Sequence, residues 1–454
     1  MKKAFLPSLL LATILSGPVS AETLFEALAT TYKTNHALKG QRAYLRAVDE
    51  NVAIAKSGYR PNVYLAGGIN RRNVDNNTQP MDYDVTDKNV SANVNQNLFQ
   101  GFQTVNAVRS ADSTVKAEQH NLANVEQQVF LSAATAYLDV LRDSAIVELQ
   151  LNNEQLLKKR LDETIERFNV GEVTRTDVAQ SRARYSSAQS ERIAAEGKLQ
   201  SSKATYEMII GQKPGKLEEP AHIRELLPKS FEEAIDFALK NNYTVKQQKN
   251  NLNARIYDVA TNSGELLPSV NLGASASRGK NNPDGWFADD STTDTMQVGV
   301  EMRVPLYNSG ISRAKIRQSK YNKWRAHEAA LDAESQATET VTSSWEYMVA
   351  NDAKTKAIKD QIKANEIALD GVQKEEYVGN RTILDVLNAY QELLSSNVEE
   401  ATARRDYYVS SLALLASMGK LTARSLQLDV ERYNAKAHSK ETRKKWLSTG
   451  IDEE

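Results

Sequence analysis

The sequence predicts an internally duplicated α+β membrane protein that combines long antiparallel helices with four β-strands per chain. Three observations support this prediction. The chain of 454 residues repeats one pattern at a fixed spacing, each copy holds two runs of alternating apolar and polar residues, and each copy continues into a very long helical stretch. A repeat of this size indicates one structural unit used twice, so the elements can be assigned copy by copy.

Composition excludes several classes of protein. The formal net charge is −1, so no basic surface predicts binding of nucleic acid. The chain has no cysteine, which rules out disulfides and thiol catalysis. Its five histidines are scattered, and neither a phosphate-binding glycine loop nor a nucleophile motif is present. We therefore expect no enzymatic activity, no cofactor and no metal site.

The first residues resemble a secretory signal peptide. Lys2 and Lys3 give a positive start, Phe5 to Leu15 form a short apolar segment, and small residues end at Ala21. The apolar segment is too short to span a bilayer as a helix, which takes about 20 residues. We expect residues 1–21 to be removed, and because Glu22 is not cysteine, we expect no lipid anchor.

The repeat is clearest in a short motif. Val170-Gly171 with Thr174 and Asp177 recurs as Val378-Gly379 with Thr382 and Asp385, at an offset of 208 (379 − 171). The offset holds over more than a hundred residues, so coincidence is excluded. We predict a first repeat at 22–211, an inter-repeat segment at 212–229, a second repeat at 230–421, and a terminal segment at 422–454.

Each repeat contains a predicted β-hairpin, at 61–99 and at 268–306. In these hairpins apolar residues alternate with polar ones over about ten positions, which is the length of a tilted membrane strand. Before each hairpin an amphipathic helix (23–57 and 230–263) ends at a proline. The strand pattern alone also fits two amphipathic hairpins packed on a soluble core, and that alternative stays open here.

After each hairpin the sequence predicts a pair of long helices. Residues 102–168 contain neither proline nor glycine, and 312–377 contain one glycine. At a rise of 1.5 Å per residue, each stretch makes a helix about 100 Å long. A shorter helix returns after each tip glycine, at 174–210 and at 382–417. Helices of this length cannot be buried in one domain, so they form a coiled coil or the wall of a tunnel.

Four strands cannot close into a barrel, and hydrocarbon does not tolerate an open sheet edge. Several chains are therefore needed, and three would supply twelve strands, an even number within the range of outer-membrane barrels. The long helices would then extend from the barrel into the periplasm. Geometry predicts an oligomeric barrel with a helical extension, but it does not determine the number of chains.

The duplicated plan resembles the TolC family of outer-membrane efflux and type I secretion proteins. The resemblance rests on Phe168-Asn-Val-Gly171, on Thr382-Ile-Leu-Asp385-Val-Leu-Asn388, and on Leu306-Tyr-Asn-Ser-Gly310 after the strands. It implies a homotrimer with a twelve-stranded transmembrane β-barrel in the outer membrane lipid, an α-helical barrel in the periplasm, and equatorial segments at 212–229 and after residue 421. It also implies a periplasmic adaptor protein and an inner-membrane transporter, ABC-type or proton-driven, as partners.

The resemblance also implies a periplasmic constriction. The positions that match the family's acidic rings are Asp385 and Asn388, and Asn388 replaces one of the two expected aspartates. A ring of carboxylates in a pore favours cations. Thr382 and Asp385, like Thr174 and Asp177, also fit a capping box that would only stabilise a helix start. Both interpretations stay open.

The resemblance further implies polar links that hold the constriction closed. Arg381 is expected to contact Asp177, with Thr176 nearby, and Glu376 stands where the family has an aromatic partner. The tip turns, at Gly171 with Val170 and at Gly379 with Val378, are expected to contact the adaptor.

Two functional alternatives remain at this stage. The first is an outer-membrane exit duct that passively conducts substrates from an inner-membrane pump to the exterior. The second is a soluble periplasmic coiled-coil adaptor or structural protein. The terminal residues 430–454 are polar and are expected to be partly disordered.

Overall fold

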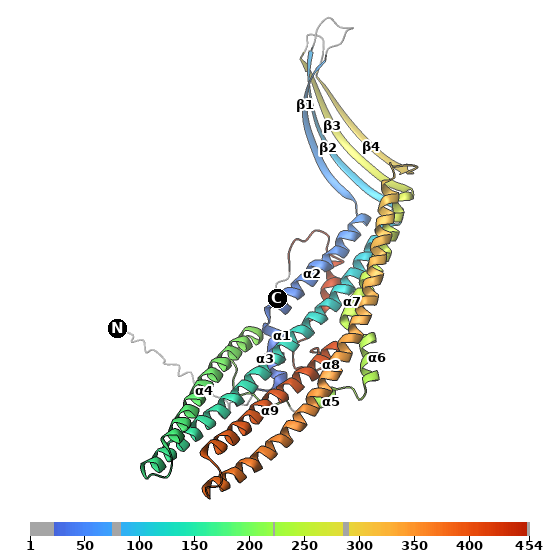
Figure 1. The fold of residues 1–454 in the computed structure, drawn as a ribbon. Helices are drawn as coiled ribbons and strands as arrows, with labels where there is room; N and C mark the ends of the chain where they lie inside the picture. The colour runs from blue at the N-terminus through green and yellow to red at the C-terminus, as the bar shows by residue number, and fades with distance from the viewer. Residues whose placement is uncertain (1–21, 75–82, 221–222, 285–289, 452–454) are drawn as a thin grey trace, which may run out of the picture. The chain divides into compact units, whose positions relative to one another are not determined.

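The four predicted strands form one antiparallel sheet. The structure is a computed structural model that describes residues 22–74, 83–220, 223–284 and 290–451, so the expected signal peptide at 1–21 lies outside the described residues. The strands follow one another in the order in which they occur in the chain, as Figure 1 shows. They are β1 (Asn62–Val74), β2 (Tyr83–Gln100), β3 (Ser269–Asp284) and β4 (Ser291–Arg303).

The sheet has one apolar and one polar face, because side chains alternate along a strand. The register places Leu65 opposite Ala92, Ala92 opposite Ala276, and Ala276 opposite Met296, so these residues share one face. Further members of the apolar face are Val63, Val90, Val94, Val270, Leu272, Ala274, Val298, Val300 and Met302. Asparagine, serine, glutamine and threonine dominate the other face. The predicted alternation is thus a two-sided sheet whose apolar side is exposed.

Long helices follow each hairpin, as predicted. They are α3 (Gln103–Asn169) with α4 (Arg175–Ile210) in the first repeat, and α8 (Ile311–Tyr377) with α9 (Ile383–Ser417) in the second. No helix within the described ranges has both the length and the hydropathy needed to cross a membrane.

The chain divides into two compact units. One unit comprises Glu126–Asp236 and Thr340–Arg432 with the residues up to Ala37, and the other comprises Leu38–Val125, Phe237–Glu339 and Tyr433–Glu454. We call them the tip unit and the strand unit. Both α3 and α8 contribute residues to each unit.

The helix that precedes each hairpin is broken at an asparagine, which differs from the single helix expected. The first copy holds α1 (Leu24–Thr34) and α2 (His36–Lys56), and the second holds α6 (Phe231–Asn241) and α7 (Tyr243–Ser263). Asn35 adopts an extended backbone and its amide group donates to the Ile209 carbonyl, while Asn242 caps α7 by accepting from two backbone amides. Asparagine side chains compete with helical backbone bonds, which explains both breaks.

The strand unit also holds residues 433–451, which contain a helix although partial disorder was expected for 430–454. Helix α10 (Ala435–Thr442) packs against α2 and α3. His438 lies 3.0 Å from the carboxylate of buried Asp49, and Arg443 lies 2.5 Å from Asp112. Burial raises the pKa of Asp49, although the hydrogen bond from His438 opposes this. The hydrogen bond between His438 and Asp49 and the ion pair between Arg443 and Asp112 give this polar segment partners on which to dock.

In the core of the tip unit, the first described residue, Glu22, contacts the inter-repeat segment 212–229. This segment contains the short helix α5 (Ile223–Leu226). A bridge joins Glu22 and Leu217. The buried hydroxyl of Tyr137 lies 2.7 Å from the Glu22 carbonyl and 2.6 Å from the Glu218 carbonyl, and it accepts from the Glu218 amide. Burial raises the pKa of Tyr137 to about 12, so the hydroxyl stays protonated and can donate.

Replacing Tyr137 by Phe is expected to destabilise the tip unit by about 1–3 kcal/mol, because it leaves buried backbone groups without their partner. Denaturant unfolding of the purified protein measures this loss. The control is Tyr347→Phe, since the Tyr347 side chain is 67% exposed and its hydroxyl is available to water. Equal midpoints for the two variants would show that the Tyr137 hydroxyl does not hold the inter-repeat segment.

Candidate functional site

The two helix pairs of the tip unit end in the same turn. Gly171 has φ +83 and Gly379 has φ +79, a region that L residues with a side chain rarely adopt. The amide of Glu172 donates to Arg167, and the amide of Asn380 donates to Glu375, which completes the Schellman arrangement in each copy. Added Cβ atoms at the two glycines would meet nothing within 4 Å, so backbone conformation and not crowding requires glycine.

Both return helices start with a capping box. The Asp177 carboxylate accepts from the Thr174 amide at 2.8 Å, and the Asp385 carboxylate accepts from the Thr382 amide at 3.0 Å. The bonds from the Thr382 amide and hydroxyl, and the charge of Arg381, lower the pKa of Asp385. The capping interpretation therefore describes Asp177 and Asp385 within one chain. The lowered pKa keeps the Asp385 carboxylate ionised at neutral pH.

Replacing Asp385 by Ala is expected to speed amide hydrogen exchange in the first turn of α9 about fivefold at neutral pH, because the cap is lost. A lowered pKa means that the stabilisation exists above the ordinary value of 3.8 and disappears as the pH falls through the lowered pKa. The difference from the wild type should therefore vanish in acid. Asp177→Ala is the control, and it should affect only the start of α4.

The predicted gate residues have other partners within the chain. Arg381 donates to Glu375 at 2.8 Å, and Asn388 accepts from Arg184 at 2.8 Å. Thr176 is exposed. The structure thus places Arg381 and Asp177 in separate interactions of one chain, and a contact between them stays a prediction.

Sequence reasoning missed a direct link between the two helix pairs. The guanidinium of Arg167, near the end of α3, donates to the carboxylate of Glu376, near the end of α8, at 2.7 Å. Hydrogen bonding to Glu376 raises the pKa of Arg167. Arg160 lies 3.3 Å from the Tyr390 hydroxyl, one step further from the tip. The repeat offset of 208 could have indicated this link, because it aligns Arg167 of the first repeat with Glu375 of the second, next to its actual partner Glu376.

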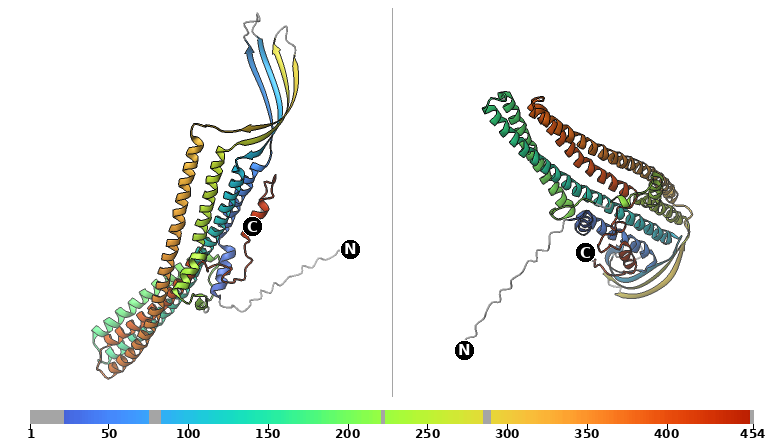
Figure 2. Two further views of the ribbon diagram at one scale, coloured as in Figure 1. Left: turned by 90° about the vertical axis from the view of Figure 1, so that its right-hand side faces the viewer. Right: turned by 90° about the horizontal axis from the view of Figure 1, so that it is seen from below.

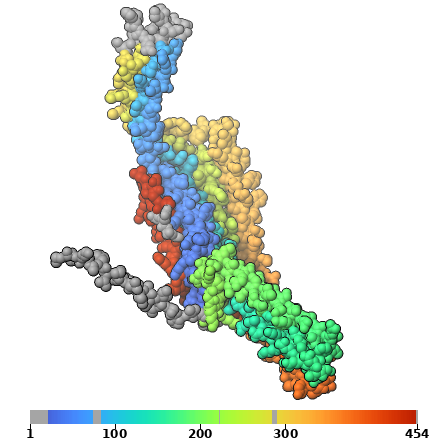
Figure 3. Space-filling view, turned by 90° about the vertical axis from the view of Figure 1, so that its left-hand side faces the viewer, coloured from blue at the N-terminus to red at the C-terminus, as the bar shows by residue number. Residues whose placement is uncertain are grey.

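Apolar contacts support these polar links. Leu157 of α3, Ala188 of α4 and Leu387 of α9 form one buried cluster. Figure 2 shows the two helix pairs beside each other at their tips. Outside this contact α4 is largely exposed, with Ile193 at its surface, and the space-filling view in Figure 3 shows α4 forming one face of the tip unit.

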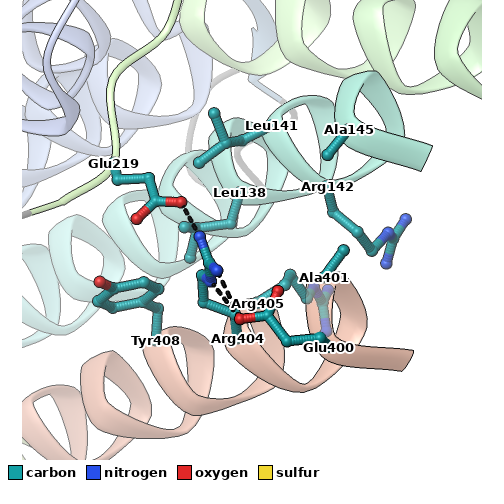
Figure 4. Close-up of a pocket in the computed structure, with 10 residues that line it drawn as sticks. All are labelled: Leu138, Leu141, Arg142, Ala145, Glu219, Glu400, Ala401, Arg404, Arg405 and Tyr408. Carbon is teal, nitrogen blue, oxygen red and sulfur yellow. Dashed lines mark hydrogen bonds and ion pairs between the residues drawn. The ribbon is translucent and has the colours of Figure 1, made fainter. Parts of the chain in front are cut away.

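Further from the tips, charged side chains fill the space between α3 and α9. A cavity of about 80 Å³ is lined by Leu138, Leu141, Arg142, Ala145, Glu219, Glu400, Ala401, Arg404, Arg405 and Tyr408. Figure 4 shows Arg404 between Glu219 and Glu400, to which it is paired. A cavity this small holds water and not a substrate.

Further ion pairs, one of them with the buried carboxylate of Asp143, lie beside this cavity. Asp143 accepts from Arg142 at 2.7 Å and from the Ser202 hydroxyl at 2.5 Å, and Arg405 donates to Asp139 at 2.9 Å. Burial lowers the pKa of Arg142, but the hydrogen bond to Asp143 and the negative charges of Asp143, Asp139 and Asp406 together outweigh burial and raise the pKa. The Ser202 hydrogen bond joins α3 to α4, and the Arg405 ion pair joins α3 to α9. These contacts hold the helices of the tip unit together and do not suggest catalysis. No cluster of acidic or histidine side chains suited to a metal ion occurs among the described residues.

The duplicated helix pairs and hairpins match a known family. The family described as outer membrane efflux protein matches residues 28–212 and 234–420, one copy for each repeat. The chain belongs to this family. The alternative of a soluble periplasmic adaptor or structural protein is thereby removed.

Several relatives align with nearly the whole length of this chain. The chain is 37% identical over 445 residues to the outer membrane efflux protein BepC of Brucella suis, and the alignment covers 97% of this chain and 94% of the relative. It is 24% identical over 437 residues to the outer membrane protein TolC of Escherichia coli, across 93% and 88%. The fold is similar to the crystal structure of the Campylobacter jejuni CmeC outer membrane channel, with a TM-score of 0.77 and 14% identity across 93% and 89% of the chains.

Membership gives the function at the level of the family. The protein is a TolC-family outer membrane efflux and secretion channel with a periplasmic helical tunnel, and it is a transport protein rather than an enzyme. Channels of this family form trimers.

Proposed function

We propose that three copies of this chain form a gated, passive duct that conducts substrates from an inner-membrane pump to the exterior. The observation that carries the proposal is the sheet. Its strands β1 and β4 are both edges, and its apolar face is exposed. An open edge in hydrocarbon is very costly, whereas pairing β4 of one copy with β1 of the next closes a barrel of twelve strands.

The duct would narrow at the helix tips. In this proposal Asp385 and Asn388 line the constriction, and Arg381 contacts Asp177 near Thr176 to hold it closed. Support comes from the position of Asp385 in the first turn of α9, where a lowered pKa keeps it charged. A capping role does not conflict with a lumenal one.

The tips would also receive a periplasmic adaptor, which links the duct to an ABC or proton-driven transporter. Val170 is 71% exposed and Val378 is 66% exposed, each beside a tip glycine. Two exposed apolar residues on equivalent turns offer matched contacts to a repeated partner. The inter-repeat segment 212–229 and the terminal segment 422–454 would form the equatorial belt of the two repeats, 22–211 and 230–421.

Membrane fractionation tests this proposal. We expect the mature protein in the outer-membrane fraction, and we expect gentle detergent extraction to release a species with the mass of three chains. Circular dichroism should show a β-signal beside dominant helix. A monomer or dimer in the soluble periplasmic fraction would contradict the barrel and the gate together.

A further inference from the structure

The apolar face of the sheet ends in a row of cationic side chains. The register continues from Met296 and Ala276 toward the hairpin ends, where Val90 lies opposite Arg278, and Lys88 lies opposite Lys280. Because side chains alternate, these cations share the face of the apolar residues. Between this row and the helix end of the strands, no charged residue lies on that face. The charge therefore begins where the apolar band stops.

The three cations surround a hollow in the strand unit. Its lining consists of Gly67, Gly68, Ile69, Lys88, Asn89, Val90, Arg278 and Lys280, and its volume is about 520 Å³. Gly67 belongs to the apolar face and has no side chain, so the face is open there. The hollow thus combines an apolar wall with three positive groups, and no acidic residue lines it.

The arrangement of Lys88 and Lys280 contradicts the usual rule for sheets, in which directly opposed like charges are destabilising. Asp294 holds Arg278 at 2.7 Å, and Asp290 holds Lys280 at 2.9 Å. Lys88 has no ion-pair partner among the residues that the structure describes. Lys88 is exposed, so its ammonium group is available to an anion from outside the chain, and departures of this kind mark functional positions.

We propose that this hollow binds the phosphate of an anionic lipid headgroup in the outer leaflet. The inference rests on the proposed barrel, which places the hairpin ends away from the periplasm and the apolar face toward lipid. Lys280 lies opposite Thr292, ten residues along β4 from Met302, which is about 34 Å along the strand. With the tilt of about 40° usual in membrane barrels this is about 26 Å of bilayer thickness, close to the height of the apolar band, so Lys88 and Lys280 reach the headgroup level. Lysine and arginine near a membrane surface attract anionic lipids, and acyl chains can lie on the band below.

Binding of fluorescent lipopolysaccharide to the detergent-extracted full-length protein tests this site. We expect Lys88→Gln with Lys280→Gln to weaken binding about tenfold, because each lysine near the headgroup adds electrostatic attraction to the anionic lipid. The charge-conserving pair Lys88→Arg with Lys280→Arg should bind as the wild type does. The matched control is Arg72→Gln with Arg303→Gln, which removes two charges from the opposite face and should leave binding unchanged.

Two further arms use the wild type, so the test does not depend on folding of a variant. Lipopolysaccharide stripped of its phosphates should bind about tenfold more weakly, and inorganic phosphate should not displace the lipid, because it lacks acyl chains. Equal affinity for the stripped lipid, displacement by inorganic phosphate, or equal affinity of wild type and the glutamine pair would overturn the proposal. Membrane fractionation distinguishes failure of this site from failure of the proposed barrel. If the protein is a trimer in the outer membrane but binds intact and phosphate-stripped lipopolysaccharide equally well, only the lipid site is refuted.

Discussion

Replacing Arg167 by Glu is expected to raise the conductance of the closed channel about tenfold. Arg167 joins the end of α3 to Glu376 of α8 at 2.7 Å, so it holds the two helix pairs of one protomer together at the tip. The Arg167 side chain is 41% exposed, which limits the pair to under about 1 kcal/mol. The substitution removes the link from all three protomers at once, and in each the introduced carboxylate repels Glu376. Together these changes are enough to raise the ratio of open to closed channels about tenfold.

Single-channel recording in a planar bilayer measures this effect. The matched control is Lys158→Glu, which makes the same change of charge at an exposed position of α3 away from Glu376. The exchange Arg167→Glu with Glu376→Arg should restore low conductance, because it rebuilds the pair in reverse. If the exchanged protein conducts as strongly as the single variant, the link does not act on the gate.

Replacing Asp143 by Ala is expected to destabilise the tip unit by about 3 kcal/mol. Asp143 is 3% exposed and accepts from Arg142 and from Ser202. Removing one member of a buried pair leaves the other charge without compensation, and this costs far more than the loss of a surface pair. Arg142 retains Asp139 at 3.1 Å, so the cost stays at the lower end of the usual range.

Guanidinium unfolding followed by circular dichroism measures this loss. Ser202→Ala should cost less, about 1.5–2 kcal/mol, because it removes one donor to the buried carboxylate while Arg142 still donates to it. The control is Asp360→Ala, whose side chain is 81% exposed and pairs only with Lys363 among the described contacts, and it should leave the midpoint unchanged. Equal midpoints for Asp143→Ala and Asp360→Ala would show that the buried network does not stabilise the wall.

The duplication and the element types follow from the sequence because they depend on neighbouring residues. Alternation in 61–99 and 268–306 specifies strands, and the absence of proline from 102–168 specifies a long helix. Gly171 and Gly379 follow from the backbone of the turn itself. Thr382 and Asp385 likewise form a cap from residues three positions apart. Each of these signals is local, so a single sequence carries it.

Tertiary structure decided the contacts between distant segments. Arg167 and Glu376 are brought together by the packing of two helix pairs, and the segment that contains α10 docks on Asp49 of α2 and Asp112 of α3. The sequence alone left Glu376 without a partner and the terminal residues without a structure.

The sheet shows the same division. Alternation determined that one face is apolar, but the register of β2 against β3 decided that Lys88 and Lys280 lie opposite each other. A shift by one residue would have sent either lysine to the other face. The sequence by itself determined the duplicated hairpins, the long helix pairs and the capped starts of the return helices, since these depend on short-range propensity; it did not predict the helix breaks at Asn35 and Asn242 or the helix α10. Only the folded structure determines the register of the strands, the packing of the helix pairs and the ion-pair partner of each charged residue, because these depend on residues far apart in the chain.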